Sequence, residues 1–301
     1  DQVIHLMDRG SDAYSTTAAL VGDPARRFVI RANQNRRVVC PEADKDRPKL
    51  EDALQEAPVV AERTIELSSR DQSGRPPDAK KKHPPRKARE ATVEIRARQI
   101  ELRRPVKADD ETLPETIEVQ AVWVREIDCP EDSEPVDWRL YTSEPIEESG
   151  QVEQVVDWYQ RRWVIEEYFG ALKGACRVEE RQLESAATLT TALGGMAVAA
   201  WRLLAVRTLT QHAPERPAEI LFRSSQLAVM VESSKTDLEE AEGTSLKQAL
   251  LAVAAMGGHL SRNGPPGWLV LHRGYSTLRT QELAWRDGRR RGQREGTREA
   301  I

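Results

Sequence analysis

The chain has 301 residues, 39% of them hydrophobic, which is enough for two or three domains with sizeable cores. Its net charge of -4 excludes a uniformly basic coat for nucleic acid but leaves room for local basic patches. The three cysteines, Cys40, Cys129 and Cys176, are too few and too far apart for a disulfide framework or a zinc cluster, which indicates a reducing, cytoplasmic setting.

The first forty residues predict a strand–helix–strand unit. Residues 3–7 read as a buried strand, residues 13–20 as a short helix and residues 27–33 as a second strand. Asp8 comes directly after the first strand. Ligand sites of open α/β sheets lie at such carboxyl ends, although an ordinary turn aspartate is the better explanation of Asp8 when it is taken alone.

Residues 41–149 predict a mostly β insertion. Apolar and polar side chains alternate over residues 59–67, 92–104, 116–128 and 136–142, as they do in strands with one buried face. Residues 68–90 are rich in Pro, Ser, Lys and Arg and predict a solvated loop, with DNA contact by Lys80 to Lys87 as the alternative.

A helix beginning near residue 151 carries the most informative pattern. At about 100° per residue, Tyr159, Arg162, Glu166 and Lys173 fall within a sector about 60° wide. A carboxylate beside two cations and a phenol suits a metal-bound phosphate, because the carboxylate holds the cation and the other groups grip phosphate oxygens. A solvated helix face with ion pairs four residues apart explains the same geometry.

The remainder of the chain predicts helices. Residues 186–209 are apolar enough to raise a membrane span as an alternative, but Arg202 and several threonines favour a buried helix packed under the sheet. Residues 246–256 predict an apolar helix ended by Gly257 and Gly258. The basic stretch that closes the chain predicts a disordered, solvated tail.

The spacing Tyr-x2-Arg-x3-Glu-x6-Lys resembles the signature of the insertion-sequence-four family of bacterial DDE transposases, and Tyr159, Arg162, Glu166 and Lys173 fill its four positions. The segments DRGSDAY, beginning at Asp8, and RFVIRAN, beginning at Arg27, resemble the family's second catalytic aspartate and the strand after it. Residues 257–278 resemble the C-terminal domain of the Tn-five-like members.

The resemblance implies a partial α/β ribonuclease-H-like catalytic core with an inserted mostly-β subdomain and a C-terminal α-helical domain. The core would comprise residues 1–40 and 150–215, the insertion residues 41–149, and the dimerisation domain with its basic tail residues 216–301. The implied partners are double-stranded DNA, at transposon ends and at the target, and a second copy in a homodimer. No membrane is implied, and the implied location is the bacterial cytoplasm, at the nucleoid.

The resemblance also implies phosphodiester cleavage and strand transfer by two Mg²⁺ ions, for which Mn²⁺ can substitute, with a hairpin intermediate. Asp8 and Glu166 would be two of the three catalytic carboxylates that hold the metal. The first aspartate is expected on a strand before residue 1. The chain is therefore expected to lack that ligand and the family's N-terminal DNA-binding domain, and to be inactive alone.

Six DNA contacts follow from the same resemblance. Tyr159, Arg162 and Lys173 would contact phosphates at the transposon end, and Arg31 would meet the same DNA. Trp138 would stack beside a flipped base, with Trp163 in the same base pocket. Without the resemblance, Trp138 is better explained as a core or cross-strand aromatic residue.

Two other interpretations remain. One is a non-catalytic, DNA-binding or dimerising remnant of a transposase, and the other is a different metal nuclease of the ribonuclease-H-like fold. An upstream strand ending in Asp would favour the enzyme over the remnant. Joining of DNA ends would separate a transposase from a simple nuclease.

Overall fold

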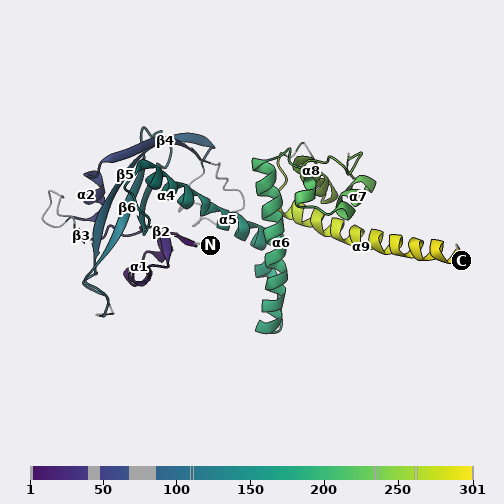
Figure 1. Cartoon of the computed structure of the whole chain (residues 1–301), viewed down its shortest axis with the longest axis horizontal. Coiled ribbons are helices and arrows are strands. Elements are labelled where there is room, and N and C mark those ends of the chain that lie inside the picture. Colours follow the sequence, from purple (N-terminus) through teal and green to yellow (C-terminus); the bar gives the residue numbers. More distant parts are fainter. Residues whose placement is uncertain are drawn as a thin grey trace. The chain divides into compact units, whose positions relative to one another are not determined.

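The structure is a computed structural model that describes residues 3–39, 48–67, 86–108, 110, 112–233, 235–236, 238–260, 262 and 264–299, with only the backbone for residues 292–299. Cys40 and most of the predicted basic loop, residues 68–85, lie outside these ranges. The chain forms two compact units, Asp1–Trp163 (unit 1) and Val164–Ile301 (unit 2), and each is described by itself (Figure 1). The division falls inside the predicted signature helix.

Unit 1 is built on one mixed sheet with the strand order β1-β2-β7-β6-β5-β3, and β4 also pairs with β5. The strands are β1 (Ile4–Met7), β2 (Arg27–Arg31), β3 (Val38–Val39), β4 (Val59–Leu67), β5 (Arg89–Arg103), β6 (Thr116–Glu126) and β7 (Asp137–Thr142). β1 and β2 are parallel, and the other pairs are antiparallel. The four strands predicted between residues 59 and 142 are confirmed, and they extend the sheet that β1 and β2 begin.

Alternation along the strands creates a core on each face of this sheet (Figure 1). On β2, Phe28 and Ile30 pack with helices α1 (Tyr14–Val21) and α2 (Leu50–Gln55). Val29, between them, packs on the opposite face with α4 (Ser149–Arg161). The sheet is thus covered by helices on both sides, which is the layered α/β arrangement that the sequence predicts.

A buried ion pair fixes the turn that follows β1. The Asp12 carboxylate accepts backbone N–H bonds from Asn33 at 2.6 Å and Gln34 at 2.8 Å. It also pairs with Arg36 at 3.0 Å, and the two side chains are 1% and 12% exposed. These bonds tie the 3₁₀ turn η1 (Arg9–Ser11), and with it the end of β1, to the chain beyond β2.

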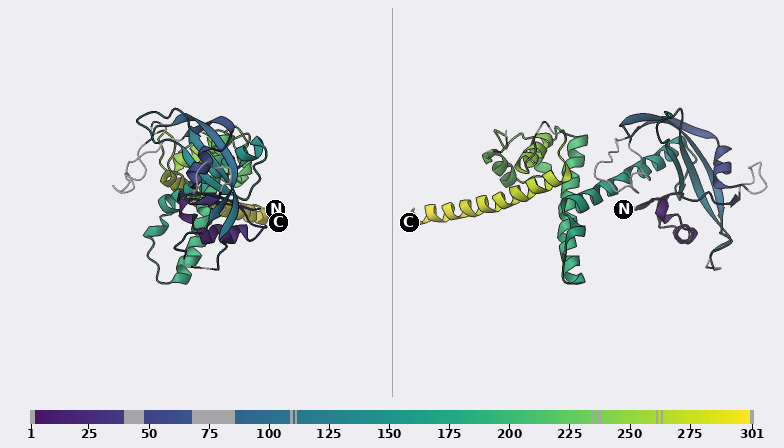
Figure 2. Two further views of the ribbon diagram at one scale, coloured as in Figure 1. Left: turned by 90° about the vertical axis from the view of Figure 1, so that its left-hand side faces the viewer. Right: turned by 180° about the vertical axis from the view of Figure 1, so that it is seen from behind.

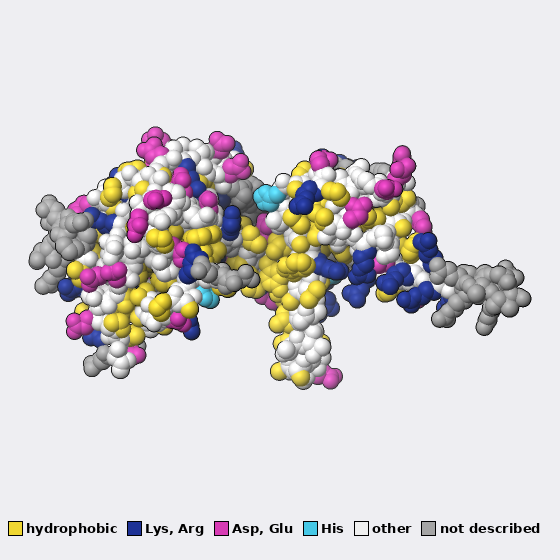
Figure 3. All heavy atoms as spheres, in the orientation of Figure 1, with side chains coloured by type: hydrophobic (Ala, Val, Ile, Leu, Met, Phe, Trp, Pro, Cys, Tyr) yellow, Lys and Arg dark blue, Asp and Glu magenta, His cyan; other side chains and the backbone are white. Residues whose placement is uncertain are grey.

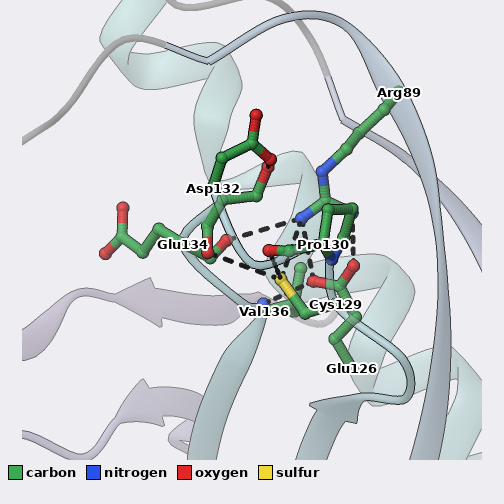
Figure 4. Close-up of polar contacts among 8 residues, drawn as sticks. Arg89, Glu126, Cys129, Pro130, Asp132, Glu134 and Val136 are labelled. Atoms are coloured by element: carbon green, nitrogen blue, oxygen red, sulfur yellow. Dashed lines mark hydrogen bonds and ion pairs between the residues drawn. The ribbon is translucent and has the colours of Figure 1, made fainter.

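A second buried ion pair lies at the corner between β6 and β7 (Figure 4). Arg89 forms a two-pronged pair with Glu126, whose carboxylate also accepts the backbone N–H of Val136 at 2.9 Å. Cys129 lies against the same guanidinium, with Sγ and an Arg89 nitrogen 3.6 Å apart. Burial and the Glu126 charge raise the pKa of the Cys129 thiol, which keeps it protonated at neutral pH.

The prediction of one regular helix for the signature residues is wrong. It consists of α4, the separate helix α5 (Trp163–Gly170) and a π-helical turn, η2 (Ala171–Ala175). Arg162 lies between α4 and α5, and the N–H of Cys176 bonds five residues back to the carbonyl of Ala171 at 3.1 Å. Because the π turn changes the angular step, the shared sector estimated for all four signature residues does not extend to Lys173.

Unit 2 is helical, with α6 (Ala186–His212), α7 (Ser224–Glu232), α8 (Leu246–Met256) and α9 (Trp268–Glu299) as its main elements. A Cβ on Gly257 would lie 2.0 Å from the carbonyl oxygen of Val270. One on Gly274 would lie 1.8 Å from that of Val253. Only glycine therefore permits the close backbone approach between the end of α8 and α9.

α6 is long and apolar enough to cross a membrane by length and composition alone, within the described ranges, and 22% of its most apolar window is buried. Its C-terminal half supplies buried residues such as Leu203 and Val206 to the unit 2 core. Its N-terminal half exposes apolar side chains, including Leu189 and Leu193. Packing of this helix under the sheet stays a prediction.

The end of the chain differs from the prediction of a disordered tail. α9 continues as a helix from Trp268 to Glu299 (Figure 2). Its first half packs through Leu271 and Leu278 into the unit 2 core, whereas residues 286–291 are exposed. Arg is a strong helix former, so a helix anchored by this core can extend through the arginine-rich stretch.

Candidate nucleic-acid interface

Three of the predicted site residues lie at one edge of the unit 1 sheet. β1 and β2 are parallel, with Met7 opposite Ile30, so Asp8 and Arg31 follow at their shared carboxyl ends. β7 runs antiparallel, with Leu140 opposite Arg31, which places Trp138 at the same edge. The parallel pairing of β1 and β2 therefore places the turn that contains Asp8 at the same end of the sheet as Arg31 and Trp138, which are predicted to contact DNA.

A cavity of about 330 Å³ opens beside this edge. It is lined by Arg31, Glu66, Leu67, Arg86, Trp138, Tyr159, Gln160, Arg162 and Trp163, all of them in unit 1. Its volume is at the lower end of the range, about 300–1,000 Å³, that small-ligand pockets occupy. Five of the six residues predicted to contact DNA therefore line one cavity, from strands and helices far apart in the sequence.

The cavity has an aromatic floor. The rings of Trp138 and Tyr159 meet edge to face, with centroids 5.4 Å apart and planes at 63°. Tyr159 and Leu67 are buried in the core beneath β2 and β7, and Trp138 is partly buried against the same cluster. Trp163 is 52% exposed. Packing therefore holds one aromatic pair in place, while the second indole remains accessible to a stacking partner.

Guanidinium groups supply the charge of the cavity. Arg31 donates to the backbone carbonyl of Asp137 at 2.9 Å. Burial of the Arg31 side chain lowers its pKa, and the nearby positive charge of Arg9 lowers it further. The interaction with Tyr159 raises the pKa of Arg31 and so opposes both effects. Arg162 lies over the Tyr159 ring, 5.9 Å from the centroid. Arginine stays charged despite such shifts, so the partly desolvated Arg31 attracts an anion more strongly than a fully solvated cation does.

Sequence reasoning missed four residues of this cavity, Glu66, Leu67, Arg86 and Gln160. The alternation of residues 59–67 predicts that strand, but no sequence signal predicts that β4 pairs with β5 and brings Glu66 to this edge. Gln160 is also held from β4, because its side-chain oxygen accepts a bond from Arg63 at 2.9 Å. These residues were missed because their places in the cavity depend on contacts between elements of the folded chain, which local sequence patterns do not predict.

The two predicted catalytic carboxylates lie in different units. Asp8 is exposed at the end of β1, and its side chain accepts the N–H of Gly10 at 2.9 Å. Glu166 is exposed on α5. Both offer the oxygen ligands that Mg²⁺ prefers, which fits the predicted ion. Among the described residues, no three His, Cys, Asp or Glu side chains gather in a metal-binding group.

The sixth predicted DNA contact, Lys173, lies in unit 2 and outside the cavity. Its ammonium group pairs with Glu179 at 2.7 Å, and the two side chains are 55% and 65% exposed. An ion pair this exposed contributes little free energy, so Lys173 can exchange Glu179 for a phosphate at low cost. Its role at the DNA stays a prediction.

Unit 1 is thus an α/β domain, a mixed sheet covered by helices, with a carboxylate at a strand end and an arginine–aromatic cavity beside it. Residues 6–202 match the family model described as Transposase DDE domain. Because this match spans almost two thirds of the chain, the chain belongs to the DDE transposase family. Membership implies a ribonuclease-H-like fold, a DNA substrate and phosphoryl transfer, and domains of this family generally use divalent metal ions.

Proposed function

We propose that the chain is a cut-and-paste transposase of the insertion-sequence-four type that works through a DNA hairpin. The observation that carries the proposal is the cavity that Arg31, Trp138, Tyr159, Arg162 and Trp163 line together beside the end of β1. By the resemblance, Tyr159 and Arg162 fill positions of the family signature, Trp138 and Trp163 correspond to its base pocket, and Arg31 corresponds to an arginine that meets the DNA end. A metal nuclease without a hairpin step has no need of an aromatic pocket for an extruded base.

Asp8 and Glu166 are the proposed metal-holding carboxylates. Bound Mg²⁺ would activate the attacking oxygen and stabilise the leaving oxygen of the phosphodiester. Both side chains are exposed, and one Asp8 oxygen accepts the N–H of Gly10. A third carboxylate completes the family's set, and β1 has room for the strand that would carry it. Among the described strands β1 pairs only with β2, so its other edge can accept a neighbour.

The cavity is the proposed site of the flipped base. Extrusion of a base costs a few kcal/mol of stacking, and an aromatic partner recovers about 1–3 kcal/mol of it. Trp138 is held by Tyr159 in a fixed position, and Trp163 is accessible to the second face of a base. Arg31 and Arg162 lie where the phosphates that flank such a base would need positive charge.

Residues 216–301, the C-terminal part of unit 2, form the proposed dimerisation domain. Apolar side chains remain exposed on its helices, among them Leu251 on α8 and Leu283 on α9. Sedimentation velocity of the full chain is expected to show a dimer, and a chain ending near residue 218 is expected to sediment as a monomer. Persistence of the dimer after truncation would place the interface elsewhere.

A strand-transfer assay tests the proposal as a whole. The chain, extended by its N-terminal residues, is incubated with Mg²⁺, a duplex carrying the terminal repeat of its element and a circular target plasmid. A transposase produces hairpin ends and joined products, and Asp8→Asn or Glu166→Gln lowers both by several orders of magnitude. Cleavage without joining would indicate a nuclease, and binding without cleavage would indicate a non-catalytic remnant.

A further inference from the structure

A dense cluster of exposed arginines lies on α9, outside the cavity and on the other unit. Arg279, Arg286, Arg289, Arg290 and Arg291 are all exposed, and none of them has an ion pair in the described part of the chain. Figure 3 shows Lys and Arg side chains gathered along this helix ahead of its undescribed end. Because the whole chain carries a net charge of -4, this concentration of positive charge is local.

The acidic residues within the same stretch do not neutralise it. Glu282 is 3% exposed and is bonded to Arg223 at 3.2 Å, Ser225 at 2.6 Å and Gln226 at 3.1 Å. Its charge is therefore used inside unit 2, between α7 and α9. Asp287 is exposed and offsets one arginine. The solvated surface of residues 279–291 keeps a clear excess of positive charge.

Helical spacing aligns three of these arginines. At about 100° per residue, Arg279, Arg286 and Arg290 fall within a sector about 40° wide. At 1.5 Å per residue they span about 16 Å along the helix. Duplex DNA carries one phosphate charge per about 1.7 Å of its axis, so a row of this length can face several phosphates at once.

We propose that this row, Arg279, Arg286 and Arg290, binds the phosphate backbone of duplex DNA without regard to sequence. It would be a second DNA contact, separate from the arginine–aromatic cavity of unit 1. Guanidinium groups pair with phosphate oxygens through two parallel hydrogen bonds, which suits a backbone contact. The inference rests on the proposed function only for the role that the bound DNA has in the cell. The binding itself is argued from the charge and spacing of the arginines.

The large apolar residues among residues 279–291 are Leu283, which is 55% exposed, and Trp285, and a single exposed leucine does not make the apolar face of a membrane-surface helix. An interfacial helix buries aromatic and leucine side chains on the face between its cations. Here the indole N–H of Trp285 donates to Glu232 at 3.0 Å, and the Arg289 guanidinium lies over the same ring, 4.9 Å from its centroid. Trp285 is thus already engaged within the protein, and a polyanionic duplex is the better match to the exposed charge.

The salt dependence of binding to a 30-bp duplex of arbitrary sequence tests the inference. The full chain is compared with the triple variant Arg279→Gln, Arg286→Gln, Arg290→Gln by fluorescence anisotropy from low to moderate salt. Each lost phosphate contact makes the slope of log K against log salt less steep by about 0.9. The triple variant is therefore expected to lose about 2 to 3 units of slope and to bind every duplex sequence more weakly.

A matched triple variant controls for net charge. Arg216, Lys235 and Lys247 are also exposed cations of unit 2, and their replacement by Gln removes the same charge without touching the row. The inference requires this control to keep almost all of the original slope. An equal loss in both variants, or an unchanged slope in the first, overturns it. Binding of the same variants to vesicles of anionic lipid distinguishes a membrane partner. If the α9 triple variant loses binding to these vesicles but binds DNA as the unchanged chain does, the inference is also overturned.

The result is independent of the proposed transposition chemistry. If the cavity assignment fails, Arg31→Gln and Trp138→Ala will leave hairpin formation unchanged while the α9 variant still alters the salt slope. If the α9 inference fails, the slope will be unchanged while the cavity variants still block hairpin formation. Circular dichroism of each variant confirms that α9 remains helical.

Discussion

Trp138 and Tyr159 meet edge to face, with ring centroids 5.4 Å apart, although one begins β7 and the other lies near the end of α4. The contact joins the sheet edge to the helix that carries the family signature. It also places Arg162, which lies over the Tyr159 ring, beside the same cavity. The contact between Trp138 and Tyr159 thus connects the start of β7 to Arg162, the arginine of the family signature.

Removal of the Trp138 ring tests its proposed role in base extrusion. Trp138→Ala is expected to lower hairpin formation by the N-terminally extended chain by about 10- to 100-fold, because stacking on an aromatic side chain contributes about 1–3 kcal/mol per base. A 2-aminopurine at the extruded position reports the step directly and should remain quenched. Trp201→Ala, at an exposed position of α6, serves as the control. Equal effects of the two substitutions would contradict the assignment.

The Asp12–Arg36 pair is expected to be important for stability. Arg36→Ala leaves the buried Asp12 carboxylate without its cation and should lower the free energy of unfolding of unit 1 by about 3–5 kcal/mol. Arg26→Ala breaks an ion pair with Asp23 in which both side chains are about half exposed, and should cost at most about 1 kcal/mol. Urea unfolding, followed by tryptophan fluorescence, distinguishes the two. Similar losses would show that burial of the Asp12 pair has no energetic consequence.

Stability at acidic pH should depend on Glu126. Burial alone would raise the pKa of Glu126, but bonds from Arg89 and the Val136 N–H, together with the Arg89 charge, hold it below its ordinary value of 4.5. The ionised carboxylate therefore contributes stability that is complete above about pH 4.5 and is lost as the pH falls through the folded-state pKa. The gap in unfolding free energy between the native chain and Glu126→Gln should shrink below that pH. A gap that is constant down to about pH 3 would contradict this, and Glu131→Gln, at an exposed position, is the control for the substitution itself.

Two glycines of α9 provide a matched pair. Gly274→Ala places a methyl group 1.8 Å from the Val253 carbonyl oxygen, so α8 and α9 must separate. We expect a loss of about 3 kcal/mol or more, at the upper end of the usual cost of overpacking. Gly288→Ala meets nothing within 4 Å and should stabilise the helix by about 0.5–1 kcal/mol. Thermal unfolding of unit 2 measures both, and a stabilising Gly274→Ala would refute the close approach.

The sequence predicted most elements because their signals are local. The alternation of β4 and the apolar run of α8 gave both elements with the bounds that the structure shows, and the place of Asp8 after the first strand followed from the strand–helix–strand pattern. The break at Arg162 and the π turn at Lys173 were missed, because helical periodicity assumes a uniform angular step. The helical tail was missed because its stability comes from the core that anchors the start of α9 rather than from its own composition.

Residues of the candidate site could be predicted from the sequence only where they belong to a motif that resembles the family. Arg31, Trp138, Tyr159, Arg162 and Trp163 were all proposed from the resemblance, and the structure brings them to one cavity. Glu66 was not proposed, since its place in the cavity depends on the pairing of β4 with β5, and Arg86, which precedes β5, was not proposed either.

The most direct test of the account is an X-ray structure of the chain bound to a DNA end and Mn²⁺, with the ion located by its anomalous scattering. The account predicts Mn²⁺ within about 2.5 Å of carboxylate oxygens of both Asp8 and Glu166, beside a phosphate of the bound end. Carboxyl groups of Asp8 and Glu166 farther apart than about 10 Å, or an ion held by other residues, would contradict the catalytic assignment.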